Sequence, residues 1–282
     1  MNFVLNERKY KMPEGPECHS IAKSLDELIS SKNITDIKIL GGRYFTHKFP
    51  EGYEEFCTNM KGSPTTVKSI RVKGKLIYWI FSNNFVMLNT LGMSGSWTKK
   101  HYKHCDVCVE YGEDKKIWFR DQRHFGTIKF IPESMLGQKL ETLGCDILTN
   151  EFTESHWQYL CGRYSDKTLP ALIMNQKRIS GIGNYLKCEI LYEAKISPFR
   201  KISEISTEDL MKVYKCIKVI PRASLKAKGV SIRDYNLPDG SDGNYQFALK
   251  VYNKKKDSLG NKVKKSQTED KRTTHWVPAV QV

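Results

Sequence analysis

The residues with the clearest chemical potential stand near the start of the chain, in the run MPEGPE at residues 12–17. The nitrogen of an internal proline is a tertiary amide without a proton, so it is not a nucleophile. If the chain is trimmed after Met12, Pro13 gains a free secondary amine, which attacks an aldehyde and forms a Schiff base. Glu14 is next to that amine and suits proton transfer. We therefore expect the active form to begin at Pro13, with residues 1–11 a start-site artefact or a removable leader.

Lys75 is a second candidate, because it follows Gly74 at the point where an apolar strand is expected to begin. A lysine at a strand end is most often simply solvated. The same position also suits a contact with a phosphate or a substrate, and the residue pattern leaves both interpretations open.

Two loops rich in small residues, at residues 91–96 (LGMSGS) and 121–126 (DQRHFG), are predicted to be tight turns between strands. Arg123 and Phe125 are two residues apart on an extended loop, so they project to one side. Side chains of this kind can fill the space left when a base leaves the stack of a nucleic acid. Each loop on its own also fits an ordinary hairpin.

A third turn, at residues 180–186 (SGIGNYL), is predicted to open a helix. The free N–H groups and the positive dipole at a helix N-terminus suit a phosphate. Asn184 could cap this helix or donate to the phosphate. An ordinary capped turn would give the same pattern.

The charge balance favours a polyanionic partner. The 282 residues include 46 Lys and Arg against 31 Asp and Glu, a net charge of +15, which is typical of nucleic-acid-binding proteins. Residues 250–272 contain nine basic and three acidic residues, a composition that suits contacts with a phosphate backbone. We find no apolar run of membrane-spanning length and no signal peptide. The eight scattered cysteines favour reduced thiols, so we expect an intracellular protein.

A metal site is an alternative use of His101, His104, Cys105 and Cys108, whose spacing resembles that of metal ligands. Residues 105–111 are predicted to form a strand, however, and residues three apart on a strand point to opposite faces. This geometry argues against zinc binding.

The periodicity predicts an α+β protein. A helix is expected over residues 18–29, followed by strands at 35–40, 66–72, 76–81, 85–88, 107–111, 116–120 and 127–130. Helices are expected at 153–161, 168–175, 184–193 and 207–219, and a final strand pair at 247–252 and 274–276. This pattern divides the chain into a β-rich domain at 12–133, a linker at 134–145, a helical domain at 146–245 and a hairpin at 246–282.

Taken together, these motifs resemble the formamidopyrimidine-DNA glycosylase and endonuclease VIII family. The resemblance covers the chain from Met12 to Gln281, and six motifs occur in the family's order: MPEGPE, the Gly-Lys strand, LGMSG, the D-x-R-x-FG loop, GIGNYL and the terminal RTT-x-W hairpin. It implies an N-terminal β-sandwich with a flanking helix, then a helix–two-turns–helix domain with a hairpin finger. DNA would lie in the cleft between them.

The resemblance also implies roles for individual residues. Pro13 would be the nucleophile and Glu14 its acid–base partner, with Lys75 assisting and Arg272 binding the phosphate beside the lesion. Residues that would contact DNA are the space-filling Met93, Arg123 and Phe125, the helix-start Asn184, and Arg233 in a lesion-capping loop. The implied reaction is removal of an oxidised base, joined to cleavage of the strand by successive β- and δ-elimination.

Departures from the family pattern affect the finger most. The family finger usually holds zinc on four cysteines, but Val277 and Val280 replace the last pair and residues 254–265 contain no cysteine. The finger therefore resembles the zincless finger of endonuclease VIII-like members, and we expect no cofactor. Thr90 and Gln122 replace a histidine and a proline that are common in the family.

The expected partner is damaged double-stranded DNA, with single strands as a further candidate, bound by a monomer. Substrate choice stays open: residues 229–235 resemble the formamidopyrimidine branch, whereas the finger resembles the branch that prefers oxidised pyrimidines. Formamidopyrimidines are common to both branches, and oxoguanine is a further candidate. The alternative from another class is a non-catalytic DNA-binding module on the same fold, which would bind without cleaving.

Overall fold

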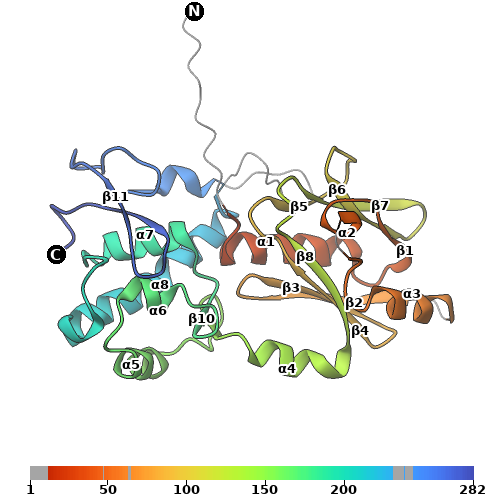
Figure 1. Cartoon of the computed structure of the whole chain (residues 1–282), viewed down its shortest axis with the longest axis horizontal. Helices are drawn as coiled ribbons and strands as arrows, with labels where there is room; N and C mark the ends of the chain where they lie inside the picture. The colour runs from red at the N-terminus through yellow and green to blue at the C-terminus, as the bar shows by residue number, and fades with distance from the viewer. Residues whose placement is uncertain (1–11, 47, 63–64, 231–237, 239–243) are drawn as a thin grey trace, which may run out of the picture.

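The computed structural model describes residues 12–46, 48–62, 65–230, 238 and 244–282. The strand-rich part and the helical part lie at opposite ends of the molecule, and α4 (Leu136–Glu141) runs along the edge between them (Figure 1). None of the helices in these residues is long and apolar enough to cross a lipid bilayer. The expected α+β architecture, with a sheet domain followed by a helical domain, is confirmed.

The first domain is built from eight antiparallel strands in the order β5-β7-β6-β1-β2-β3-β4-β8. The strands are β1 Asn33–Ile39, β2 Thr65–Lys73, β3 Leu76–Phe81, β4 Phe85–Thr90, β5 Gly95–Thr98, β6 Cys105–Tyr111, β7 Lys115–Asp121 and β8 Thr127–Pro132. Only two residue pairs join β1 to β2 in the described part of the chain, so the order divides there into two halves of four strands.

The two halves pack face to face as a β-sandwich. Trp79 on β3 and Trp97 on β5 belong to different halves, yet their ring centroids are 5.0 Å apart and both rings are buried. The indole N–H of Trp97 also donates to the side-chain oxygen of Asn89 on β4, at 3.0 Å. Asn89 and Trp97 flank the 91–95 turn, so this bond fixes where one of the predicted DNA-contacting loops begins and ends.

Helix α1 (Gly15–Ile29) covers the edge of the sandwich nearest the helical domain (Figure 1). Ile21, Leu25 and Ile29 follow the helical repeat and are fully buried. The short helices α2 (Arg43–Thr46) and α3 (Tyr53–Gly62) were not expected from the sequence. Phe56 is the buried residue of α3, so the segment lacks the apolar stripe that would reveal a helix.

The described part of the second domain contains four helices: α5 Glu154–Arg163, α6 Leu169–Ile173, α7 Asn184–Glu193 and α8 Thr207–Lys226. Helix α7 is central, since residues 185–192 are all buried. A short parallel strand pair, β9 (Cys145–Asp146) and β10 (Ile179–Ser180), joins the first residues of this domain to the segment just before α7. Short 3-10 turns lie at Glu133–Met135, Ile202–Glu204 and Tyr245–Ala248.

Of the two predicted C-terminal strands, the one at 274–276 is confirmed and the one at 247–252 is wrong. The hairpin pairs β11 (Lys264–Gln267) with β12 (Thr273–Trp276), whereas residues 247–252 form no strand. The backbone N–H groups of residues 250–252 all donate to the buried carboxylate of Glu189 on α7, at 2.7–3.1 Å. Because these donors are already used by a side chain, the segment has none left for a partner strand.

We expect Trp97→Phe to destabilise the protein by roughly 1–3 kcal/mol, because the buried amide oxygen of Asn89 loses its indole donor while most of the aromatic packing is kept. Urea unfolding followed by fluorescence measures the change. The matched control is Tyr102→Phe at an exposed aromatic, which should change stability by less than about 0.5 kcal/mol. Equal effects of the two substitutions would contradict this account of the sandwich.

Candidate active site

Glu14 joins the two domains. It precedes α1, but its carboxylate lies at the N-terminus of α7, where it accepts the N–H groups of Gly183, Tyr185 and Leu186 at 2.8, 2.7 and 3.2 Å. Two of these donors are first-turn groups that have no partner within the helix. The approach requires glycine at 183, since a Cβ there would lie 2.3 Å from the Glu14 carboxyl carbon.

The surroundings of Glu14 set its protonation. Burial raises its pKa to about 7, partly opposed by the charge of Lys75 and by the N–H groups of α7, and the nearby Glu17 adds to the rise. Such a carboxyl exchanges protons near neutral pH, as a general acid–base group must. A pKa in this range is compatible with the acid–base role predicted for Glu14.

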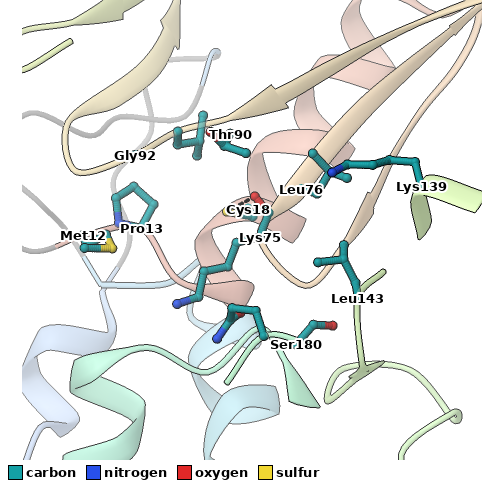
Figure 2. Close-up of a pocket in the computed structure, with 12 residues that line it drawn as sticks. Met12, Pro13, Cys18, Lys75, Leu76, Thr90, Gly92, Lys139, Leu143 and Ser180 are labelled. Carbon is teal, nitrogen blue, oxygen red and sulfur yellow. Dashed lines mark hydrogen bonds between the residues drawn. The ribbon is translucent and has the colours of Figure 1, made fainter. Parts of the chain in front are cut away.

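Pro13 and Lys75 line the same cavity, of about 280 Å³, between the two domains. Figure 2 shows Pro13 entering from the N-terminal segment and Lys75 from the turn between β2 and β3, with Ser180 of the helical domain below them. Gly92 of the 91–95 turn lies on the wall of the cavity opposite Ser180. The cavity therefore brings together four of the motifs singled out in the sequence.

The turn that carries Lys75 is fixed by a carboxylate of the other domain. Gly74 has φ = +60°, and its N–H donates to Asp146 on β9 at 2.7 Å. The same Asp146 oxygen lies 2.9 Å from Nε2 of His19 on α1.

Burial lowers the pKa of Lys75, with the charge of Arg272 acting in the same direction and Glu14 opposing both. Lys75 is therefore not simply a solvated strand-end residue.

Arg272 and Asn184 reach the site from the helical side. Arg272 is exposed at the end of the finger turn, close enough to Lys75 for its charge to act there. The side-chain amide of Asn184, the first residue of α7, donates to the carbonyl of Thr273 at 2.9 Å. The start of α7 and the finger are therefore in direct contact.

The two loops predicted to enter DNA are joined to each other. Asp121 accepts the N–H of Gly126 at 2.6 Å and the hydroxyl of Ser94 at 2.5 Å. Ser94 in turn accepts the N–H of Arg123 at 2.9 Å. Phe125 is left 54% exposed, with the Arg123 guanidinium 5.4 Å from its ring centre. An exposed aromatic ring on so firmly held a loop suits insertion into a base stack.

Of the two remaining predicted DNA contacts, only Met93 lies in the described part of the chain. Met93 lies between Gly92 and Ser94, half-buried in the 91–95 turn. Arg233 falls outside the described residues.

Glu17 is a structural residue of the site that the sequence did not single out. It is fully buried and accepts the N–H of Glu14 at 2.8 Å, the N–H of Val230 at 2.7 Å and the hydroxyl of Tyr185 at 3.0 Å. Burial raises its pKa. The sequence did contain a signal for this role. Glu17 is three residues after Glu14, and a glutamate at position N3 of a helix often accepts the N–H of the N-cap residue.

The metal alternative receives no geometric support. Across the described ranges of the chain, no three His, Cys, Asp or Glu side chains gather as metal ligands. Cys105 and Cys108 are both buried in β6. In the finger, Val277 packs with Cys188, Tyr192, Val251 and Val263 in a small apolar cluster, a set of side chains that does not suit zinc.

Comparison with known proteins agrees with this geometry. Models of the formamidopyrimidine-DNA glycosylase N-terminal, H2TH and C-terminal domains match residues 12–128, 143–236 and 238–282. Curated formamidopyrimidine-DNA glycosylases from Shouchella clausii and Bacillus cereus are each 27% identical, over 86% and 96% of this chain and 89% and 99% of their own length.

Solved structures share the fold. The MutM (Fpg) protein of Thermus thermophilus matches with a TM-score of 0.82 at 20% identity, over 95% of this chain and 98% of its own. Wild-type Lactococcus lactis Fpg, solved with DNA containing N7-benzyl-Fapy-dG, matches with a TM-score of 0.84 at 24% identity, over 95% and 99%. The three domain models together span most of this sequence in the family's order, and the chain belongs to the formamidopyrimidine-DNA glycosylase family of base-excision-repair enzymes.

Proposed function

We propose that this protein removes oxidised bases from DNA and cleaves the strand at the resulting abasic site, with Pro13 as the nucleophile. The observation that carries the proposal is that Pro13 and Lys75 line one cavity, while the charges of the buried Glu14 and the exposed Arg272 both act on Lys75. A Schiff base needs a free amine, so the competent form begins at Pro13.

In this mechanism the Pro13 nitrogen attacks C1′ of the damaged nucleotide, and the glycosidic bond breaks with its electron pair going to the base. The proton of the attacking nitrogen passes to the departing base. Opening of the sugar ring then gives an iminium ion while O4′ gains a second proton. Glu14 supplies that proton, because its pKa of about 7 keeps a large fraction protonated at neutral pH.

The iminium ion acidifies the C2′ hydrogen, so loss of that proton expels the 3′-phosphate by β-elimination. A second elimination expels the 5′-phosphate. Lys75 and Arg272 stabilise the departing phosphates, since both are cations near the cavity, and Arg272 assists the second elimination. Water then hydrolyses the iminium ion and restores the Pro13 amine.

DNA would lie between the two domains, with its backbone held by Asn184 and by the lysines of the finger and with Phe125 replacing the flipped base. Flipping costs a few kcal/mol, less for a damaged base. The relatives are named for formamidopyrimidines, and we propose these lesions as the principal substrates, with oxidised pyrimidines and oxoguanine as further candidates.

The nucleophile can be tested by borohydride trapping on DNA with an abasic site. Protein that begins at Pro13 should form a covalent adduct, whereas protein that retains Met1 should form almost none because its Pro13 nitrogen is acylated. Both forms should bind DNA, which the same gel shows without borohydride. Equal trapping by the two forms would contradict the proposed nucleophile, and binding without any trapping would favour a non-catalytic module.

The proton donor predicts a pH dependence. Above a pH of about 7 the Glu14 carboxyl loses its proton, so the single-turnover rate of base excision should fall by up to about tenfold per pH unit. Glu14→Gln should lower the rate by roughly 10²–10⁴ and abolish this decline. Glu133→Gln, at a surface ion pair with Lys68, is the matched control and should keep the parent profile. A Glu14→Gln variant that still shows the parent's decline would contradict the assignment.

If Phe125 replaces the flipped base, its removal should affect duplex DNA more than single-stranded DNA. Phe125→Ala should slow excision from duplex DNA by roughly 5- to 150-fold, the value of one base–aromatic stack, but should leave single-stranded substrate unaffected. A panel with formamidopyrimidine, oxidised pyrimidine and oxoguanine lesions measures both effects. Tyr102→Ala, at another exposed aromatic, serves as control. Equal slowing on single strands would show that Phe125 does not act on the stack.

A further inference from the structure

The turn between β11 and β12, residues 268–271, lies immediately before Arg272 and is held to the helical domain by side chains. Lys271 has φ = +58°, so the chain turns sharply there before entering β12. The finger lacks the cysteines of a zinc site, and some other interaction must fix the direction in which Arg272 leaves the turn.

A buried ion pair provides that interaction. Nζ of Lys187 on α7 lies 2.7 Å from Oδ2 of Asp270, and the two side chains are 0% and 5% exposed. Burying both charges costs several kcal/mol each unless they are paired with good geometry. The turn can therefore take this position only with Asp270 opposite Lys187, which makes the pair a strong determinant of register.

Neighbouring contacts fix the same turn from other sides. Glu269 accepts both the N–H and the hydroxyl of Thr168, each at 2.9 Å. The hydroxyl of Thr268 donates to Asp270 at 2.5 Å and lies 2.7 Å from the hydroxyl of Thr274. These contacts link the turn to the segment before α6 and close it on itself.

Lys187 is also placed to couple the finger to the DNA-facing end of α7. It is three residues after Asn184, so the two side chains lie on the same face of the helix. Asn184 bonds the carbonyl of Thr273, one residue after Arg272, and Lys187 bonds Asp270, two residues before it. Arg272 is thus bracketed by two contacts from one helical turn.

We propose that Lys187 and Asp270 are positioning residues for Arg272, and that their ion pair does in this finger what a bound metal does in a zinc finger. This inference rests on the proposed function, in which Arg272 binds a phosphate and assists the second elimination. It also implies that the finger works without zinc.

The test compares Lys187→Met with the double variant Lys187→Met/Asp270→Leu. The double variant removes both charges, and replacing a buried ion pair by apolar side chains is often neutral for stability. Cleavage of abasic-site duplex is measured as the ratio of the product of both eliminations to the product of the first alone. The salt dependence of DNA binding is measured in parallel, since each lost phosphate contact lowers the slope of log K against log[salt] by about one.

Both Lys187 variants should lower the product ratio at least fivefold and make the salt slope shallower by about one, and both should keep borohydride trapping. Arg272→Ala should change the ratio and the slope in the same direction. The matched control is Lys212→Met, at an exposed ion pair on α8, which should behave as the parent. Dialysis of the parent against EDTA should change neither readout.

A folded double variant with the parent's ratio and slope, while Arg272→Ala changes both, would overturn the positioning role and leave the proposed function intact. If Arg272→Ala itself keeps the parent's product ratio and salt slope, both the positioning role and the proposed function would be overturned. Loss of activity on EDTA treatment that zinc restores would show that a metal, and not the ion pair, holds the finger.

Discussion

The carboxylate of Glu14 at the N-terminus of α7 is the interaction on which the rest of the structure depends. Its position fixes the beginning of α1 against the helical domain, and the neighbouring N–H of Gly15 donates to the carbonyl of Gly181 at 2.8 Å. The cavity that Pro13 and Lys75 line lies at this junction between the domains. In the proposed mechanism the same carboxyl group is also the acid–base group, so a substitution of Glu14 would affect both the architecture and the chemistry of the site.

Buried carboxylates recur throughout the junction. Glu17 accepts N–H groups from its own segment and from Val230, Asp146 accepts that of Gly74, and Glu189 those of the segment leading into the finger. Such bonds are directional and expensive to leave unmade. Hydrogen bonds of this kind fix the relative position of the segments that they join, whereas non-directional apolar contacts would allow those segments to shift. That property suits a site whose reacting groups come from segments far apart in the chain.

Much of this arrangement was predictable from local sequence. Periodicity and turn residues predict most of α1, as a helix over 18–29, and the strands on both sides of the 121–126 loop. They also predict the helix beginning at Asn184, but they miss β5, the strand that follows the 91–95 turn. The motif order placed Pro13, Glu14 and Lys75 at one site. Local patterns could not reveal that Glu189 takes the donors of residues 250–252, nor that Lys187 meets Asp270, because these contacts join residues far apart in the sequence.

The central claim is that the nitrogen of Pro13, and not Nζ of Lys75, forms the bond to DNA. Burial lowers the pKa of Lys75, so this lysine is the serious rival nucleophile. The most direct test is peptide mapping by mass spectrometry of the borohydride-trapped adduct after digestion with trypsin. The account predicts the DNA remnant on the peptide that begins at Pro13 and ends at Lys23. A remnant on a peptide containing Lys75 would contradict it.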